Sequence, residues 1–491
     1  MSNIPRVEND TSAFGELSVS ETTPVVQVQF PYNLNTRIVE SRDNNGTSSV
    51  ALNMLKLSTG AAANQSSTVL SIDPIKYNPG QGALVRFTAL FESTPAANST
   101  QWIGVGDTGD GYFFGYDGTT FNVMRRKGGV PEVRKFEITT GSSHAENITI
   151  TLDGDADATV AVTNTASITL TANEIAAHDY SDLGQGWSAH AMGPFVFFTS
   201  YNAAAQAGTY SISATSAAAT ITRPVTGVAA TETKTAQASW NHDVMDGSGS
   251  STMTLDQTKG NVYQIRYQWL GFGRISYYIE DDTGQGGKFV LVHEIHFANS
   301  AVEPSVKNPT LPMCAIVANA ANTSDMVLKS GSWGGFVEGK VVDLGISNAI
   351  SFSDTGTGTT ELPLFTIHNH DIYQSLVNRV TILPRVLSIS INAAAANRTG
   401  IIRIRLNATL TGAVFAAHDS NTSVAHIDST ATAVSGGTIV FADSVVEGGS
   451  RELDLEKFVD KLNPPDFLTV TLESNAGTID SLSTLTWKEL F

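Results

Sequence analysis

Residues 262–297 read VYQIRYQWLGFGRISYYIEDDTGQGGKFVLVHEIHF, and this stretch decides the fold class. Apolar side chains recur at alternate positions in three runs: Tyr263, Ile265, Tyr267 and Trp269, then Ile275, Tyr277 and Ile279, then Phe289, Leu291 and Ile295. Because successive side chains of a strand point to opposite faces, each run predicts a strand with one apolar face. The polar segment 281–287 has the composition of a turn. The stretch therefore predicts the centre of a β-sandwich core.

A second aromatic stretch predicts a β-hairpin in the same sandwich. Asp117-Gly118 separates Tyr112–Tyr116 from Thr120–Arg126, and Asp-Gly between two such runs is a strong hairpin signal. Because 491 residues exceed one sandwich, we predict an all-β chain with two jelly-roll-like β-sandwich domains. The predicted parts are an N-terminal arm (1–23), a discontinuous sandwich (24–135 and 225–345), a small α+β module inserted into it (136–224) and a C-terminal sandwich (346–491).

Three segments predict local structure other than strands. Thr171 and Glu174 have the spacing of a capping box, which predicts the start of a helix in the inserted module. The Gly, Thr and Ser residues of Ser351–Thr360 predict a linker into the C-terminal sandwich. Leu453–Leu462 predicts a short helix, ended by Pro464-Pro465.

The charge balance argues against nucleic acid as a partner. The chain has 29 basic and 47 acidic residues, a formal net charge of −18, and only 15% charged residues. Nucleic-acid binding needs clustered cations that release counterions from phosphates, and the one basic cluster here is Arg125–Lys127 with Arg134-Lys135 nearby. The single cysteine, Cys314, lies in an apolar run and predicts a buried, inert thiol.

The N-terminal sequence MSNIPRVEND has neither a basic region nor an apolar run, so we expect no secretory signal. No apolar run approaches the roughly 20 residues of a membrane span, so no membrane insertion is expected. A chain made in the host cytoplasm, with a surface poor in charge and rich in small polar residues, fits a virion protein.

The loop sequence GDTGDGYFFGYDG, residues 106–118, leaves two interpretations open. Asp107 and Asp110 could bind sugar hydroxyls or calcium while Tyr112 and Tyr116 stack on a glycan ring. Alternatively, the aspartates accept hydrogen bonds from turn amides and the aromatics are core. Tyr112, Phe114 and Tyr116 share one face of the expected strand, which favours the second interpretation. We therefore expect no calcium-dependent glycan binding by this hairpin.

His368 and His370 form a second candidate ligand site or interface. In an extended segment both lie on one face, and with the adjacent Asp371 they could hold a divalent metal. Solvated loop histidines are the favoured interpretation, so no metal is predicted. No spacing in the chain brings together an acid, a base and a nucleophile, and no phosphate-binding glycine loop occurs. We therefore predict neither an enzyme nor a cofactor.

Three stretches resemble structural proteins of tailed bacteriophages and large DNA viruses, of the virion, tail or fibre type: residues 101–129, residues 262–312 and residues 434–491. The resemblance implies assembly and surface roles and no catalytic residues. We predict a virion structural protein on the particle exterior, as a capsid-decorating, vertex, fibre-base or tail-associated subunit. Its partners would be copies of itself, as a homo-oligomer with a trimer favoured, and other virion proteins. The alternative is a glycan-binding module that attaches the particle to its host.

Overall fold

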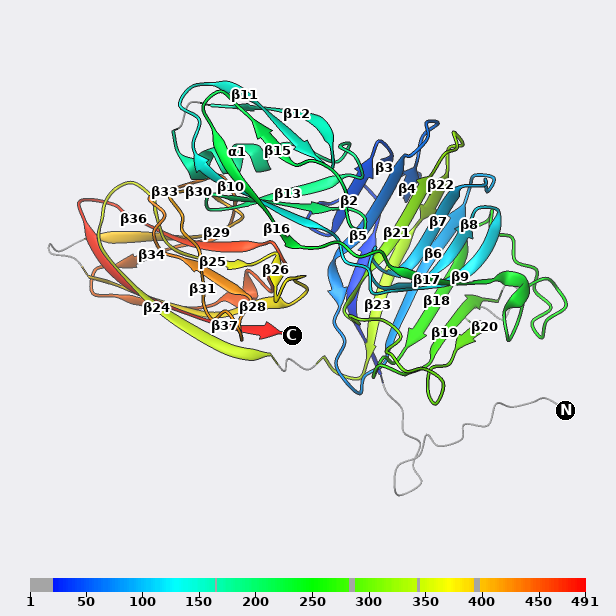
Figure 1. Ribbon diagram of the computed structural model, residues 1–491. Helices are drawn as coiled ribbons and strands as arrows, with labels where there is room; N and C mark the ends of the chain where they lie inside the picture. Colours follow the sequence, from blue (N-terminus) through cyan, green and yellow to red (C-terminus); the bar gives the residue numbers. More distant parts are fainter. Residues whose placement is uncertain (1–20, 164–165, 282–287, 342–344, 393–397) are drawn as a thin grey trace, which may run out of the picture. The chain divides into compact units, whose positions relative to one another are not determined.

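The computed structural model describes residues 21–163, 166–281, 288–341, 345–392 and 398–491, apart from the side chains of residues 155–157. The predicted arm lies outside these residues up to position 20, and so does most of the predicted turn 281–287. The chain forms two compact units. Unit 1 comprises residues 1–41, 46–127 and 232–342, and unit 2 comprises residues 42–45, 128–231 and 343–491. The described chain is built almost entirely of antiparallel strands (Figure 1), which confirms the predicted all-β class.

Unit 1 contains two antiparallel sheets. The nine-stranded sheet has the order β20-β19-β18-β6-β22-β4-β3, with β23 also pairing with β6 and β1 with β23. Its strands are β1 (Thr22–Gln29), β3 (Thr47–Ala51), β4 (Met54–Ser58), β6 (Ala83–Phe91), β18 (Asn261–Tyr267), β19 (Ile275–Glu280), β20 (Phe289–Ile295), β22 (Val327–Ser330) and β23 (Ser332–Glu338).

The second sheet of unit 1 has seven strands in the order β17-β9-β8-β7-β21-β5-β2. They are β2 (Val39–Asn44), β5 (Ser66–Ile75), β7 (Ser99–Gly106), β8 (Gly111–Asp117), β9 (Thr120–Lys127), β17 (Thr231–Ala236) and β21 (Leu311–Asn319), and a 3₁₀ turn η1 (Gln237–Ser239) follows β17. The predicted hairpin is confirmed, because β8 and β9 pair from Gly111 with Arg126 to Asp117 with Thr120. Gly118 has a φ of 58°, which glycine adopts at little cost.

The aromatic faces of both sheets meet in one core. Phe114 of β8 is fully buried, and its ring contacts Tyr263 at 4.9 Å, Tyr277 at 5.3 Å and Phe87 at 6.5 Å between centroids. Edge-to-face and offset pairs of this kind are favourable beyond the area that they bury. The predicted buried faces of β18 and β19 are therefore confirmed.

Two parts of the opening stretch differ from the prediction. Trp269 lies beyond the end of β18 and is only partly buried, because the backbone turns at Leu270, which has a φ of 34°. In β20 the register shifts, so that Tyr277 faces His293 while Tyr278 faces Leu291. This β-bulge places Val292 in the core and leaves Phe289 and Leu291 half-buried, so the predicted apolar face was wrong for the first two members of that run.

The C-terminal part of unit 2 has a four-stranded sheet, β24-β37-β28-β35, and a six-stranded sheet, β31-β32-β25-β36-β29-β34, around a common core. The strands are β24 (Ile346–Thr357), β25 (Leu362–Asn369), β28 (Thr381–Asn392), β29 (Thr399–Leu406), β31 (Ala416–Ala417), β32 (Ala425–Asp428), β34 (Thr438–Val446), β35 (Ser450–Asp454), β36 (Phe467–Ser474) and β37 (Ile479–Leu490). Two short ladders, β26 (Ile372–Tyr373) with β27 (Leu376–Val377) and β30 (Thr409–Thr411) with β33 (Ala433–Ser435), complete it.

Two predictions for this part were wrong. Most of the expected linker Ser351–Thr360 belongs to strand β24, because Phe352 packs on the core, with its ring stacked on that of Phe365 at 4.3 Å. The expected helix Leu453–Leu462 is the end of β35 followed by a single 3₁₀ turn η2 (Leu455–Lys457). In both segments tertiary pairing outweighs the local propensity.

Residues 128–231 also belong to unit 2 and contain the one α-helix of the described ranges, α1 (Ile168–Ala176). Two sheets accompany it, β13-β14-β10-β16 and β12-β11-β15. Their strands are β10 (Val133–Thr140), β11 (Glu146–Leu152), β12 (Asp155–Val162), β13 (Trp187–Met192), β14 (Phe195–Ser200), β15 (Ser211–Ser213) and β16 (Ala218–Val225). In the described residues no helix is long and apolar enough to cross a membrane.

The helix begins earlier than the predicted capping box. Ser167 is the N-cap, and its hydroxyl accepts a hydrogen bond from the Leu170 amide at 3.3 Å. Thr171 is buried inside the helix and accepts a bond from the Ser142 amide at 3.1 Å. Glu174 accepts a bond from the Thr163 amide at 3.0 Å instead of capping the helix. Ser167, rather than Thr171, therefore caps the helix.

Candidate functional site

The outer face of the nine-stranded sheet carries a row of residues contributed by four strands. In β6 the side chains alternate, so that Phe87 enters the core while Arg86 is exposed. The strand register places Arg86 opposite Gln264 of β18 and opposite Gly334 of β23, and it places Gly334 opposite Gln27 of β1. The row is therefore Gln264, Arg86, Gly334 and Gln27, and it crosses the sheet at right angles to its strands.

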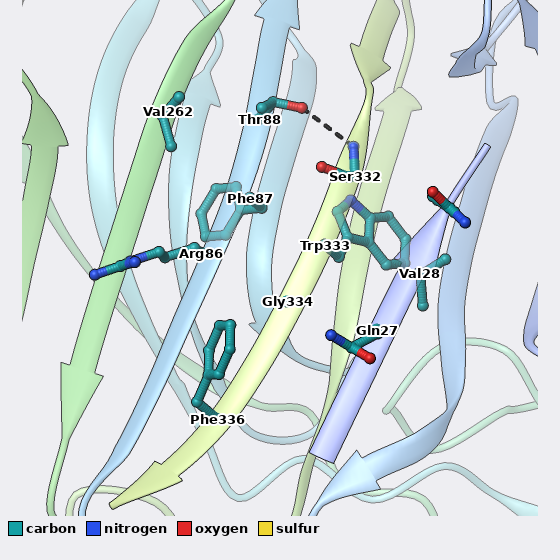
Figure 2. Close-up of a pocket in the computed structure, with 11 residues that line it drawn as sticks. Gln27, Val28, Arg86, Phe87, Thr88, Val262, Ser332, Trp333, Gly334 and Phe336 are labelled. Carbon is teal, nitrogen blue, oxygen red and sulfur yellow. Dashed lines mark hydrogen bonds between the residues drawn. The ribbon is translucent and has the colours of Figure 1, made fainter. Parts of the chain in front are cut away.

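A groove of about 410 Å³ lies along this row. Gly334 has no side chain, and Figure 2 shows Phe336 and Gln27 near its position, while the Arg86 side chain extends from β6 toward β18. A Cβ atom at Gly334 would meet ring carbons of Phe336 at 3.0 and 3.1 Å, so a side chain here would press on that ring and take up part of the groove. We call this hollow, lined by Gln27, Gln29, Arg86, Thr88, Val262, Ser332, Gly334 and Phe336 together with the buried Val28, Phe87 and Trp333, the Gly334 groove.

Arg86 is the one cationic residue in the lining of the groove, and its guanidinium is directed toward β18 and β20. Its Nε–H donates to Oε1 of Gln264 at 2.8 Å, and its guanidinium carbon lies 5.0 Å from the centroid of the Phe289 ring. No hydrogen bond or ion pair within the described ranges involves its two terminal nitrogens, Nη1 and Nη2. No described residue therefore occupies these –NH₂ groups, and a guanidinium fork suits a carboxylate or a pair of hydroxyls.

The other groups that line the groove are neutral. Gln27 and Gln29 are exposed on β1, and their amides can each donate and accept hydrogen bonds. Thr88 is already used, because its Oγ1 accepts bonds from the amides of Gly331 at 2.7 Å and Ser332 at 3.3 Å (Figure 2). Phe336 is half-buried and leaves part of its ring accessible. The groove thus combines one cation, two amides and an aromatic ring.

A second hollow of about 480 Å³ lies at the turn between β8 and β9. It is lined mainly by small residues, and its carboxylate, Asp117, is paired with Lys234 at 3.0 Å. With its charge already paired and no aromatic ring in its lining, it is the weaker candidate.

Tyr112 and Asp110, two residues of the predicted loop site, are buried and form hydrogen bonds within the protein. Tyr112 is fully buried and its hydroxyl shares a hydrogen bond of 2.9 Å with the Ser305 hydroxyl. Asp110 is 3% exposed, and its carboxylate accepts bonds from the amides of Lys307 at 2.9 Å and Asn308 at 3.3 Å. Burial raises the pKa of Tyr112 far above its ordinary value, so the phenol stays neutral. The burial expected for this aromatic face is confirmed.

The other two predicted residues of this loop have similar roles. Tyr116 is 9% exposed, and its ring packs edge-on against Phe91 at 5.4 Å, so it offers no platform for a sugar ring. Asp107 accepts bonds from the amides of Gly109 at 2.7 Å and Asp110 at 3.0 Å, as the carboxylate of a turn does.

The predicted histidines lie in unit 2 and are not solvated. His368 belongs to strand β25 and is fully buried, and the side chain of His370, just after the strand, is 12% exposed. The interpretation as loop histidines in solvent was therefore wrong. Residues Leu364–Asn369 of β25 are buried on both faces of the strand. Polar residues within such a strand are therefore buried together with the apolar ones.

Sequence reasoning missed the Gly334 groove entirely. The row along which it lies is formed by residues 27, 86, 264 and 334, which become neighbours only through strand pairing. The one local signal was the alternation of β6, in which an arginine stands on the face opposite the apolar residues.

No protein-family model matches the chain, and no curated protein matches it. Solved structures that the chain matches include the exoplasmic/lumenal domain of VIP36 in its metal-free form. The identity is 9%, the match covers 66% of this chain and 95% of that one, and the TM-score is 0.27. The legume lectin-like domain from Entamoeba histolytica has 10% identity, coverage of 64% and 98%, and a TM-score of 0.26. A chain from the atomic structure of Sulfolobus Turreted Icosahedral Virus has 8% identity and a TM-score of 0.17. The match covers 96% of this chain and 98% of that one. Similarity this distant gives no information on what this chain binds.

Proposed function

We propose that the protein binds carbohydrate in the Gly334 groove and that the preferred ligand carries an acidic sugar. The observation that carries this proposal is the row Gln27, Gly334, Arg86 and Gln264, in which an exposed arginine lines the edge of a hollow formed at a glycine. Sugars present hydroxyl groups and an apolar ring face, and a groove with amides and an accessible aromatic ring can contact both.

The acidic preference follows from Arg86. Its terminal nitrogens have no partner within the described part of the chain, so a ligand carboxylate can bind them without displacing a protein anion. Charge-assisted, two-pronged hydrogen bonds between guanidinium and carboxylate are about twice as strong as neutral ones. The chain as a whole has a net charge of −18, which disfavours general binding of anions. Preference for an acidic sugar over a neutral one would therefore depend on Arg86 itself.

A glycan array with neutral, carboxylated and sulfated members tests the proposal, followed by calorimetry on the best ligand. Arg86→Ala should weaken binding at least tenfold, about 1.4 kcal/mol. Gly334→Val should weaken it as well, by filling the hollow and pressing on Phe336. Arg451→Ala, which removes an arginine of unit 2 that is ion-paired with Asp443, serves as the matched control and should bind as wild type. Absence of binding to every glycan, or unchanged binding by both groove variants, would refute the proposal.

We also propose that this binding takes place on the exterior of a virus particle, where the chain is a capsid-decorating, vertex, fibre-base or tail-associated subunit. Two observations support a surface that contacts copies of itself or other virion proteins. Charged residues make up only 15% of the chain. Large apolar side chains stand exposed on unit 1, with Val302 at 96%, Tyr32 at 89% and Leu52 at 83%.

Assembly is tested with the purified full chain. We expect a homo-oligomer, with a trimer favoured because closed symmetry is the usual solution for identical subunits. Multi-angle light scattering gives the mass directly, and immunogold labelling of purified particles tests the location. A monomer at high protein concentration, together with unlabelled particles, would contradict the structural role and leave the glycan-binding proposal standing.

A further inference from the structure

Unit 2 contains a cluster of four histidines and one carboxylate, comprising His190, His368, His370, His426 and Asp371, which we call the histidine cluster. His190 comes from strand β13, His368 from β25 and His426 from β32, while His370 and Asp371 follow β25 directly. One ligand atom each of His190, His368 and Asp371 lies within 4.8 Å of the others. The Gly334 groove belongs to unit 1 and shares no residue with this cluster.

The spacing of these atoms is close to that of a metal site. Nδ1 of His190 lies 3.1 Å from Oδ2 of Asp371, and Nδ1 of His370 lies 3.8 Å from the same oxygen. The rings of His190 and His368 are parallel, with 5.0 Å between centroids and 4° between planes. Tetrahedral ligands about 2.0–2.2 Å from a zinc ion are roughly 3.4 Å apart. Because the lone pairs of two parallel rings do not converge on one point, binding of one ion requires the ring of His190 or His368 to turn.

The burial of the cluster leaves ring nitrogens unsatisfied. His368 is fully buried, and among the residues that the structure describes neither of its ring nitrogens has a hydrogen-bond partner. The same holds for Nε2 of His190, Nδ1 of His370 and Nδ1 of His426. Buried polar atoms are nearly always hydrogen-bonded in folded proteins, so five such atoms around one carboxylate call for an explanation. A cation bound by the imidazole lone pairs supplies one.

The protonation states of His368 and Asp371 suit metal ligands. Burial, and then the neighbouring charge of His190, lower the pKa of His368 well below its ordinary value, so the ring is neutral and keeps a lone pair. Burial alone would raise the pKa of Asp371, but the adjacent His190 and His370 hold it well below the ordinary value, and the carboxylate stays charged. Neutral imidazole and ionised carboxylate are the forms that bind transition metals.

Simple packing accounts for only part of the arrangement. The ring of His368 lies 5.5 Å from that of Phe415 and 5.9 Å from that of Phe467, so one face of the site is apolar. An aromatic residue without nitrogens would serve that packing better. The contact between Nδ1 of His190 and Oδ2 of Asp371 also keeps the carboxylate facing the cluster.

We propose that His190, His368 and Asp371 bind one divalent transition metal ion of the zinc class, with His370 as the fourth ligand. Two imidazoles and a carboxylate suit zinc better than calcium or magnesium, which prefer oxygen ligands. The ion would join strand β13 to the end of β25, two segments of unit 2 that are far apart in the sequence. Its role is therefore structural, and it stabilises unit 2.

The test uses the full chain stripped with EDTA and then titrated with Zn²⁺, or with Co²⁺ as a spectroscopic probe. We expect one ion per chain with micromolar or tighter affinity, visible Co²⁺ absorption typical of a tetrahedral site, and a higher melting temperature when zinc is bound. His368→Phe keeps an aromatic ring beside Phe415 and Phe467 but has no ring nitrogen, so the metal-free variant should fold like the metal-free wild type and lose binding at least a hundredfold.

Two further variants sharpen the result. Asp371→Asn removes the charge and should weaken zinc binding strongly, whereas His144→Ala, which changes an exposed histidine outside the cluster, should leave it unchanged. A wild-type chain that takes up no zinc would overturn the proposal. So would zinc uptake that survives in His368→Phe, because it would show that exposed histidines elsewhere account for the binding.

Discussion

The Nε–H of Arg86 donates a hydrogen bond of 2.8 Å to Oε1 of Gln264, its neighbour on the adjacent strand. Gln264 is only 4% exposed, so it can fix the guanidinium through this hydrogen bond but offers little surface for direct contact with a ligand. An arginine side chain has about 2 kcal/mol of rotamer entropy, and a partner that fixes it reduces what a ligand must immobilise. Gln264 therefore acts as a positioning residue.

We expect Gln264→Ala to weaken binding of an acidic glycan about three- to tenfold, by releasing Arg86, while Arg86 itself remains. Gln264→Glu should also weaken it, for a different reason: the new carboxylate would pair with Arg86 and compete with the ligand. Calorimetry at two salt concentrations separates the two variants, because the competing ion pair is screened by salt. Unchanged affinity in both variants would remove Gln264 from the site.

Asp110 should matter for stability rather than for binding. Asp110→Ala removes the acceptor of the Lys307 and Asn308 amides in a nearly buried place, which we expect to cost about 1–3 kcal/mol of unfolding free energy. Asp110→Asn keeps one acceptor oxygen and should cost less. Urea denaturation gives both values, and a glycan array with and without calcium checks the binding. Loss of calcium-dependent glycan binding in Asp110→Ala would show instead that the loop is a lectin site.

The core of unit 1 gives a stability prediction with an internal control. Phe114 is fully buried among aromatic rings from both sheets, so Phe114→Ala should cost about 3–5 kcal/mol. Trp269 is only partly buried, although its indole N–H donates to the Val306 carbonyl at 3.1 Å, so Trp269→Ala should cost less. Chemical denaturation followed by far-ultraviolet circular dichroism compares them. A larger effect for Trp269 would mean that the end of β18 is placed wrongly.

Glu146 should make the stability of unit 2 depend on pH. Burial alone would raise its pKa, but the Ser216 hydroxyl, the Thr215 amide and the Ser142 hydroxyl donate to the carboxylate and lower the pKa to about 2 from the ordinary 4.5. The folded state therefore binds this proton more weakly than the unfolded state does. The resulting stability is fully present above about pH 4.5 and is lost as the pH falls toward 2.

We expect Glu146→Gln to be less stable than wild type at neutral pH and to lose less stability between pH 5 and pH 2.5. Denaturation midpoints measured at several pH values test this. Glu452→Gln, at an exposed position of β35, is the control and should follow the wild-type curve. Parallel curves for wild type and Glu146→Gln would show that the hydrogen bonds around Glu146 do not stabilise its charged form.

The sequence by itself determined the strands with strong alternation and, for β8, β18 and β19, the face that each buries. Tyr263 and Tyr277, Phe114 in the hairpin, and the turn at Gly118 followed from a period of two and from the backbone freedom of glycine. These are properties of neighbouring residues, so they can be recognised without knowing the rest of the fold. The sequence also singled out His368, His370 and Asp371, because they are adjacent in the chain.

Only the tertiary structure decided what depends on pairing between distant segments. The register of β1, β23, β6 and β18 aligned Gln27, Gly334, Arg86 and Gln264, and a shift of one residue in any of these strands would have scattered them. His190 joined Asp371 from 181 positions away in the sequence. Pairing with β37 turned the apparent linker into strand β24. In each case the deciding free energy comes from contacts between segments far apart in the chain, which local sequence patterns do not contain.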